Sequence, residues 1–255
     1  MDSIEAQREF LKADPWKQWA DGGHETDQRK GIPRPAPEKP YPRDAKLVDL
    51  VAPERFGVGK MPVVEAIARR QSRREYTGGA LSLEELSFLL WATQGVREIS
   101  EGRGGVVTFR TVPSGGACHA LETYLFIDRV DGVPSGLYRY LPLEHKLLFL
   151  RSEPDLREKV TRACLGNDFV EDAAAVFMWT TIPYRMEWRY TVVAHKMIAI
   201  DAGHVCQNLY LACEAIGAGT CAIAAYDQEK MDAVLGMDGR DEFAVYAAPV
   251  GKVER

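Results

Sequence analysis

An uninterrupted apolar run, AAAVFMWTTI at residues 173–182, most constrains the fold of this chain. A strand with one face in water alternates apolar and polar residues, whereas a run without that alternation is typical of a strand buried on both faces. We therefore expect this segment to be a central strand of a sheet.

The segments around this run predict strands and helices that do not alternate strictly along the chain. Ser82 and Glu85 form an S-x-x-E capping box before LSFLLWATQ, and Gly95 is expected to end that helix. Asp227 is expected to begin a short helix that ends at Gly236. This order predicts an α+β domain with a mostly antiparallel sheet and long helices packed on it. The other expected helices span 63–70, 153–166 and 183–217, the last broken near Tyr190, and the other expected strands span 121–127, 136–141, 146–150, 220–226 and 242–250.

Composition and charge exclude several classes of protein. The 255 residues are 46% hydrophobic and 27% charged, which suffices for a sizeable core. The formal net charge of −5 argues against general affinity for nucleic acid or anionic membranes. The apolar stretch 192–219 contains His195, Lys196 and Asp201, so it predicts a buried helix and not a membrane span. A charged start without an apolar core, and five cysteines without a CxxC motif, indicate a cytoplasmic protein with free thiols.

The first 60 residues differ in composition from the rest. A helix candidate, IEAQREFLKADPWKQW, is interrupted at Pro15 and precedes a segment expected to be extended or polyproline-like. We interpret residues 1–60 as an arm on the surface of a larger domain that spans residues 61–255; a flexible leader is the alternative. The prolines of the extended segment are Pro33, Pro35, Pro37, Pro40 and Pro42.

A basic segment, ARRQSRREY at residues 68–76, is the first candidate binding site. Arg70, Ser72 and Arg74 alternate where a helix gives way to extended chain, and alternating residues on such a backbone point the same way. Two guanidinium groups and a hydroxyl would suit a phosphate. The alternative is a set of cations that complement a helix C-terminus.

Two glycine-containing segments are further candidates. In RTVPSGGACHALETYLFI, residues 110–127, Pro113–Gly116 predict a tight turn whose backbone amides can approach a planar ligand. In EAIGAGTCAIAAYD, residues 214–227, the small side chains after the helix leave room for something flat. An ordinary turn and dense helix–sheet packing are the respective alternatives.

Together these segments resemble the nitroreductase family, and within it the branch called SagB-type dehydrogenases. The resemblance rests on RRQSRREYTGGALSLEELSFLLWATQG, RTVPSGGACHALETYLF, GLYRY, IDAGHVCQNLYLACEAIGAGTCAI and YAAPVGK. The leader TDQRKGIPRPAPEKPY is similar to the N-terminal segment of that branch, so nearly the whole chain takes part. The resemblance implies a nitroreductase-like α+β sandwich, made as an intertwined homodimer with two FMN sites at its interface.

The resemblance also implies roles for the basic segment. Arg70 and Ser72 would face the FMN phosphate and ribityl chain, and Gln71 belongs to the same cofactor-binding set. Arg74 would lie near the N1/C2 edge of the isoalloxazine, where a cation stabilises the negative charge of the reduced ring.

The remaining cofactor contacts are implied in the same way. Pro113, Ser114 and Gly115 would reach the ring from the partner subunit, and Ala222, Ile223 and Ala224 would lie along its other edge. Many relatives carry an acidic residue where Ala224 stands, so only a backbone contact is expected here. Lys252 or Arg255 would replace basic phosphate ligands that relatives carry in a longer C-terminal tail.

Arg189 and Tyr190 are the candidate catalytic residues. Azoline oxidases of the SagB branch are expected to carry a Lys-Tyr pair in this region, and arginine is a poorer base than lysine. The pair is expected to contact the substrate, with a solvated helix edge as the alternative. No metal is expected, because His119, His195 and His204 lack ligand spacing and a companion carboxylate pair.

Three functions agree with these residues. The first is an FMN enzyme that passes hydride equivalents from NADH or NADPH to a small organic acceptor, such as a nitroaromatic or a quinone. The second is a dehydrogenase that acts on a peptide or another specialised metabolite. The third is an FMN-binding protein without turnover.

Overall fold

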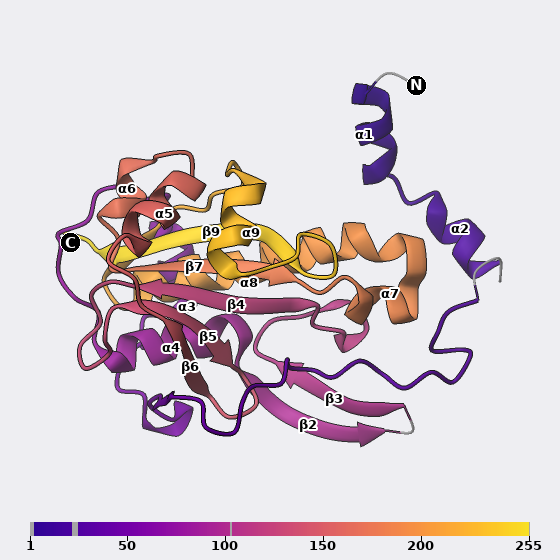
Figure 1. Cartoon of the computed structure of the whole chain (residues 1–255), viewed down its shortest axis with the longest axis horizontal. Coiled ribbons are helices and arrows are strands. Elements are labelled where there is room, and N and C mark those ends of the chain that lie inside the picture. Colours follow the sequence, from indigo (N-terminus) through magenta and orange to yellow (C-terminus); the bar gives the residue numbers. More distant parts are fainter. Residues whose placement is uncertain (1–2, 22–24, 103, 255) are drawn as a thin grey trace.

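A seven-stranded antiparallel sheet forms the centre of the molecule (Figure 1). The computed structural model describes residues 3–21, 25–102 and 104–254. The strand order is β1-β6-β5-β4-β7-β9-β8, and a separate hairpin pairs β2 with β3. The strands are β1 (Leu47–Asp49), β2 (Val96–Gly102), β3 (Gly105–Arg110), β4 (Leu121–Ile127), β5 (Gly136–Leu141), β6 (Lys146–Arg151), β7 (Ala175–Thr181), β8 (Ala218–Thr220) and β9 (Phe243–Lys252).

Helices cover both faces of this sheet. The α-helices are α1 (Ser3–Leu11), α2 (Pro15–Ala20), α3 (Val63–Arg69), α4 (Leu83–Gln94), α5 (Leu156–Ala163), α6 (Asp168–Glu171), α7 (Tyr184–Tyr190), α8 (Ala194–Ala215) and α9 (Gln228–Leu235). Short 3-10 turns lie at Pro53–Arg55, Gly115–Ala117 and Thr191–Val193.

The buried side chains of β7 explain its apolar run. Phe177 and Trp179 belong to the core shared with α4 and α8, whereas Val176 and Met178 belong to the core shared with α5 and α9. The strand lies between β4 and β9 and is paired along its whole length with both. The expectation of a central strand buried on both faces is therefore confirmed, as is the mostly antiparallel α+β fold.

The expected helix boundaries are largely confirmed. Ser82 and Glu85 form a reciprocal capping box at the start of α4, and Gly95 follows its last turn. Asp227 caps α9 through the Lys230 amide, and Gly236 ends that helix in the left-handed conformation. The long helical region breaks directly after Tyr190, before α8 begins.

The expected strand at 220–226 is wrong in extent. Only Ala218–Thr220 forms β8, and beyond it Ile223 makes a single bridge to Ala247. The small side chains of this segment allow it to lie beside β9 without continuing the hydrogen-bonded pairing of β8. The sequence does not predict the β2–β3 hairpin or β1, which pairs with β6 at the edge of the main sheet.

The N-terminal segment contacts the rest of the chain at several points. Helix α1 has no buried residue and stands away from the body in Figure 1. The ring of Trp16 lies 5.9 Å from that of Tyr190. The Lys39 ammonium donates to the Tyr124 hydroxyl and to Glu242, and β1 follows after the prolines. The proposed boundary at residue 60 remains an expectation.

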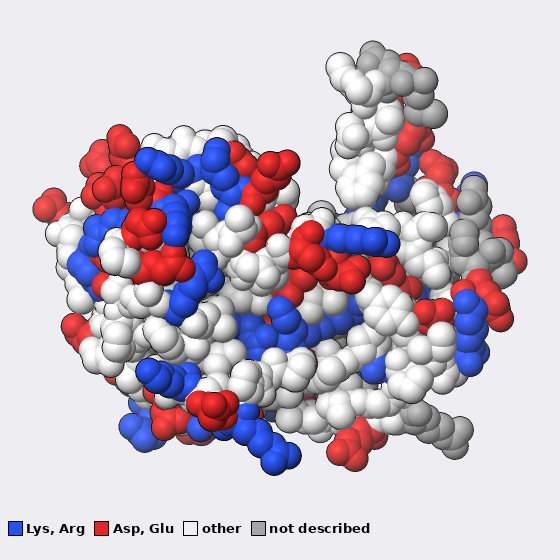
Figure 2. Space-filling view, viewed as in Figure 1, with Lys and Arg blue, Asp and Glu red and all other residues white. Residues whose placement is uncertain are grey.

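Surface and thiol properties complete the description. Acidic and basic side chains are interspersed over the face shown in Figure 2. Among the described helices, none is long and apolar enough to cross a membrane. All five cysteines are buried free thiols, as expected.

Candidate functional site

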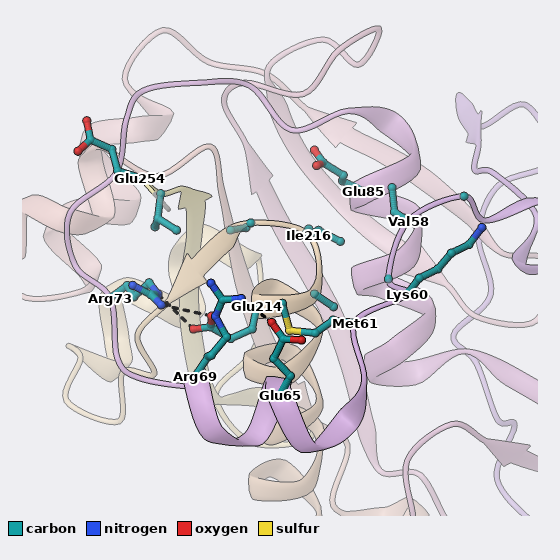
Figure 3. Close-up of a pocket in the computed structure, with 16 residues that line it drawn as sticks. Val58, Lys60, Met61, Glu65, Arg69, Arg73, Glu85, Glu214, Ile216 and Glu254 are labelled. Atoms are coloured by element: carbon teal, nitrogen blue, oxygen red, sulfur yellow. Dashed lines mark hydrogen bonds and ion pairs between the residues drawn. The ribbon is translucent and has the colours of Figure 1, made fainter.

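The basic segment after α3 has two kinds of arginine. Arg73 turns inward and pairs with Glu214 of α8 through two contacts of 3.1 and 3.2 Å, shown by dashed lines in Figure 3. The Arg73 amide also donates to the Thr220 carbonyl of β8. This ion pair fixes the segment against α8 and the sheet, on the wall of a cavity of about 540 Å³.

Arg70 and Ser72 gather around one tyrosine of α8. The Arg70 guanidinium lies 5.5 Å from the centre of the Tyr210 ring. Ser72 Oγ lies 3.0 Å from the Tyr210 hydroxyl, which also accepts a hydrogen bond of 2.8 Å from the Ala222 amide. Ser72 further bridges to Thr220. The structure thus joins the basic segment to the segment after α8.

Arg74 departs from the expected common direction. Its guanidinium lies 5.9 Å from the Phe169 ring of α6, in the opposite layer from Tyr210. Alternation on an extended backbone sets only the direction of Cβ, and the long side chains then diverge. The expectation that all three side chains point the same way is therefore wrong for the Arg74 guanidinium.

Arg70 and Arg74 differ from the neighbouring arginines in having no carboxylate partner in the part of the chain that the structure describes. Neither guanidinium forms an ion pair with any residue in the described ranges, whereas Arg69 pairs with Glu65 and Arg73 with Glu214. Ser72 and Arg74 are exposed and line a cavity of about 640 Å³ with Gln71 and Tyr76. With its amide oxygen facing Arg73, Gln71 accepts from that guanidinium at 2.9 and 3.2 Å. The Arg70 guanidinium beside the Ser72 hydroxyl is a suitable set of donors for an anion, and the Arg74 guanidinium is a second unpaired cation on the Phe169 side.

The glycine turn lies at the other end of α8. Ser114 Oγ accepts from the His119 amide at 2.9 Å, and the Gly115 amide points to Asp201 Oδ1 at 3.4 Å. Pro113 is exposed, and Gly116 has a positive φ of 58°. The turn before a 3-10 segment and β4 is therefore present as expected.

Arg189 and Tyr190 contact this turn. A Cβ built on Gly116 would lie 2.5 Å from the Tyr190 hydroxyl and 3.1 Å from the Arg189 side chain, so only glycine fits. The Arg189 guanidinium lies 5.3 Å from the Tyr190 ring. Burial raises the pKa of Tyr190 and the Arg189 charge opposes the rise, so the phenol is a proton donor at neutral pH.

The segment after α8 offers a flat and accessible backbone. Ala222 is half-buried, Ile223 is buried and Ala224 is exposed. The Ala224 amide and carbonyl form no hydrogen bond with any residue that the structure describes. Ala224 also lines an apolar cavity of about 500 Å³, whose other walls include Thr181, His195 and Tyr246.

The expected site residues form two groups within one chain. Arg70, Ser72 and Ala222 meet at Tyr210, whereas Ser114–Gly116 and Tyr190 meet near Asp201. Tyr210 and Asp201 are nine residues apart on α8, which is about 13 Å along the helix axis. A single chain therefore does not bring the glycine turn onto the basic segment.

The C-terminal candidates lie elsewhere. The Lys252 ammonium donates to Glu85 at 2.7 Å and to the Ile216 carbonyl at 3.0 Å. These contacts join the capping box of α4 to the end of α8, a position that cations commonly stabilise. Arg255 lies outside the described residues.

Tyr210 and Asp201 contact the candidate segments in the structure, but the sequence alone does not predict them as site residues. Asp201 Oδ2 is buried without a partner among the described residues, and burial raises the pKa of this carboxyl. Both residues lie within the long helix α8, where the sequence gives no sign that they differ from neighbouring helix residues. The fold places Tyr210 beside the basic segment and Asp201 beside the glycine turn, and no local pattern in the sequence contains these contacts.

The histidines do not form a metal site within the described ranges. His195 Nε2 pairs with Glu187 at 2.8 Å across the break between α7 and α8. His119 is buried, and burial with the charge of Arg110 lowers its pKa to about 3. No group of three or more metal-ligating side chains occurs in the described parts of the chain.

Comparisons with known proteins support the fold and show the family. The family model described as "Nitroreductase family" matches residues 67–252. A protein of Methanocaldococcus jannaschii named as a nitroreductase is 30% identical over 195 residues, which are 76% of this chain and 93% of the relative. The trifolitoxin-processing protein TfxB of Rhizobium leguminosarum is 25% identical over 179 residues, 68% of this chain, and the chain spans 48% of that relative.

A solved structure is similar over most of its length. The crystal structure of a Ralstonia eutropha protein named as a nitroreductase superposes with a TM-score of 0.67 and 27% identity, over 88% of this chain and 95% of that one. The family match covers the basic segment, the glycine turn and the segment after α8 alike. The chain belongs to the nitroreductase family.

Proposed function

We propose that the chain is an FMN-dependent oxidoreductase that transfers hydride equivalents between NADH or NADPH and a small organic acceptor of the nitro or quinone type. The observation that carries the proposal is the exposed Ser72 between two arginines without ion-pair partners, beside a small-residue segment with an accessible backbone. A cavity of about 640 Å³ at this place is within the usual size of cofactor sites.

The residues present fit FMN better than a dinucleotide. Arg70 and Ser72 would bind one terminal phosphate through charge-assisted hydrogen bonds. Arg74 diverges from them, which suits a separate role beside the ring, where it would stabilise negative charge. FMN supplies the hydride chemistry when bound, and the chain supplies binding, orientation and electrostatics.

A homodimer would complete this site. The glycine turn and the basic segment contact α8 at Asp201 and at Tyr210, which lie about 13 Å apart along the helix axis, so we propose that Pro113, Ser114 and Gly115 contact the flavin of the partner subunit. Helix α3 supports the dimer, because Val63, Val64 and Ile67 share a face that is 59–72% exposed in the single chain. Apolar side chains gathered in this way are typical of an interface.

The apolar cavity beside Ala224 is the proposed place of the acceptor. Its wall includes the polar side chains of His195 and Tyr246, which would contact a polar group of the acceptor. Arg189 and Tyr190 would contact substrate from the glycine turn, with the protonated phenol as donor. This arrangement favours flat organic acceptors with one or two polar groups.

A second candidate function is oxidation of a peptide or another specialised metabolite. It is supported by the similarity to TfxB, a protein named for trifolitoxin processing. Arg189 disfavours it, since arginine holds its proton more firmly than the lysine expected in azoline oxidases.

Two measurements test the proposal. Heat-released cofactor from the purified protein should migrate as FMN on chromatography, and a protein that fails to bind added FMN would overturn the proposal. Stopped-flow mixing with NADPH should then bleach the flavin rapidly. Reduction by another donor alone supports the second function, and absence of reduction by any organic donor indicates binding without turnover.

A further inference from the structure

The glycine turn is a strained piece of backbone that needs support from outside. Three residues in this turn or directly after it have positive φ values: Gly116 at 58°, Ala117 at 51° and His119 at 47°. For alanine and histidine this conformation costs roughly 1–2 kcal/mol each. The surrounding structure must therefore hold the turn in its shape.

One side chain from the N-terminal segment holds two carbonyls of this turn. The Arg34 guanidinium donates to the Ala117 carbonyl at 2.7 Å and to the Gly116 carbonyl at 3.2 Å. Among the hydrogen bonds of the described residues, the other side-chain donor to these carbonyls is the neutral Cys118 thiol, whose Sγ lies 3.9 Å from the Gly116 oxygen. A hydrogen bond from a charged donor to a carbonyl is shorter and stronger than one from a neutral donor.

Arg34 is itself held rigidly. Its amide donates to the Gly104 carbonyl at 2.9 Å, and its guanidinium lies 5.6 Å from the centre of the Trp188 ring. Trp188 in turn donates its indole N–H to the Ile32 carbonyl at 2.8 Å. The guanidinium therefore stands at a fixed place between α7 and the turn.

We propose that Arg34 is a positioning residue of the flavin site, which keeps the Ser114–Ala117 turn in the shape that lines the FMN of the partner subunit. This inference rests on the proposed function. Arg34 precedes the matched residues 67–252, so the contact comes from the N-terminal segment and not from the part shared with the family model.

The geometry gives the contact consequences beyond stability. The carbonyls that Arg34 holds belong to the residues directly after Gly115, and Gly116 packs on Tyr190 and Arg189. When the guanidinium is lost, the two carbonyls lose their charged donor and the strained turn can relax. The relaxed turn would present Pro113–Gly115 differently to the flavin and release Tyr190.

The test compares variants of the whole chain with alanine in place of an arginine that contacts the turn or of one that does not. Arg29→Ala is the matched control, because Arg29 lies in the same segment with its guanidinium 5.4 Å from the Trp19 ring but does not touch the turn. For wild type, Arg34→Ala, Arg34→Lys and Arg29→Ala, FMN affinity is measured by fluorescence titration. The visible circular dichroism of the bound flavin reports on its surroundings, and urea unfolding of the apoprotein reports on stability.

We expect Arg34→Ala to raise the Kd for FMN by roughly tenfold and to change the flavin dichroism. Both hydrogen bonds come from one guanidinium nitrogen, Nη2. Lysine keeps the charge but lacks the planar group that places this nitrogen, so Arg34→Lys should fall between wild type and Arg34→Ala. Arg29→Ala should match wild type in both flavin measurements.

Equal Kd and dichroism for Arg34→Ala and Arg29→Ala would overturn this inference alone. Failure of the wild type to bind FMN would overturn the proposed function and this inference with it. Should Arg34→Ala not fold, Arg34→Lys and Arg34→Gln carry the comparison, and a wild-type Kd and dichroism for both would overturn the inference.

Discussion

Arg69, Arg70, Arg73 and Arg74 lie in one short segment, yet their surroundings predict different consequences of substitution by alanine. Arg73 loses a bidentate pair with Glu214, and the exposed fractions of the two side chains are 23% and 7%. Breaking a buried pair by removing one partner costs roughly 3–5 kcal/mol. Because Arg73 keeps some contact with water, we expect the lower end, about 3 kcal/mol of unfolding free energy.

Arg70→Ala should leave stability almost unchanged and weaken FMN binding. Its contact with the Tyr210 ring contributes about 0.5–1 kcal/mol at an accessible site. A charge-assisted bond to the phosphate contributes roughly 1.5–3 kcal/mol, which corresponds to about a 10- to 150-fold higher Kd. Arg74→Ala should instead lower the reduction potential of bound flavin, because negative charge develops at the ring edge only on reduction.

Urea unfolding of the apoproteins, fluorescence titration with FMN and a redox titration distinguish these variants. Arg69→Ala is the control, since its exposed pair with Glu65 contributes at most about 0.5 kcal/mol. The reasoning is refuted if Arg73→Ala unfolds at the same urea concentration as Arg69→Ala. The proposed contacts with FMN are refuted if Arg70→Ala keeps the FMN affinity of the wild type and Arg74→Ala keeps its reduction potential.

Three further outcomes follow from buried groups. Burial raises the pKa of Glu38 to about 7, so its ionisation lowers stability as pH rises from about 4.5 to 7. Glu38→Gln should unfold at higher urea than wild type at pH 8, by roughly 1–2 kcal/mol because the carboxylate keeps some contact with water, with no gain near pH 4; equal curves at pH 8 would contradict this. Gly116→Ala should lower the unfolding free energy by about 1–3 kcal/mol, because its Cβ would lie 2.5 Å from the Tyr190 hydroxyl; a melting temperature like that of the wild type would argue against the packing. The five buried thiols should react with a disulfide reagent only after unfolding, and rapid reaction of the native protein would contradict their burial. They are Cys118, Cys164, Cys206, Cys213 and Cys221.

Local patterns in the sequence predicted the elements of the fold well. The run at 173–182 and the Ser82–Glu85 capping box each depend on neighbouring residues, so the printed sequence contains the whole signal. The structure of segment 220–226 was harder to predict, because small apolar residues suit a strand and an irregular segment equally. Whether the strand continues depends on its pairing with β9, which ends at Thr220.

The sequence predicted which segments contribute to the candidate site, but not which residues of those segments contact one another. The basic segment and the glycine turn stand out in the sequence, yet Ser72 meets Tyr210 across 138 positions and Arg34 meets Gly116 across 82. Such pairs depend on the packing of α8 and on the path of the N-terminal segment, which no local pattern contains. The divergence of Arg70 and Arg74 likewise depends on which rings the fold places beside them.

A heterodimer with one complete site tests the shared FMN site most directly. One chain carries Arg70→Ala with Ser72→Ala, and the other carries Pro113→Glu, a change at an exposed residue that leaves the core intact. Two different affinity tags isolate the mixed dimer, and bound FMN is counted per dimer.

If each site combines the basic segment of one chain with the glycine turn of the other, the mixed dimer has one intact and one doubly altered site. The account predicts one FMN per mixed dimer and little or none in either homodimer of variants. A mixed dimer without FMN, next to a wild-type dimer that binds two, would contradict it, because sites contained within single chains would both be damaged.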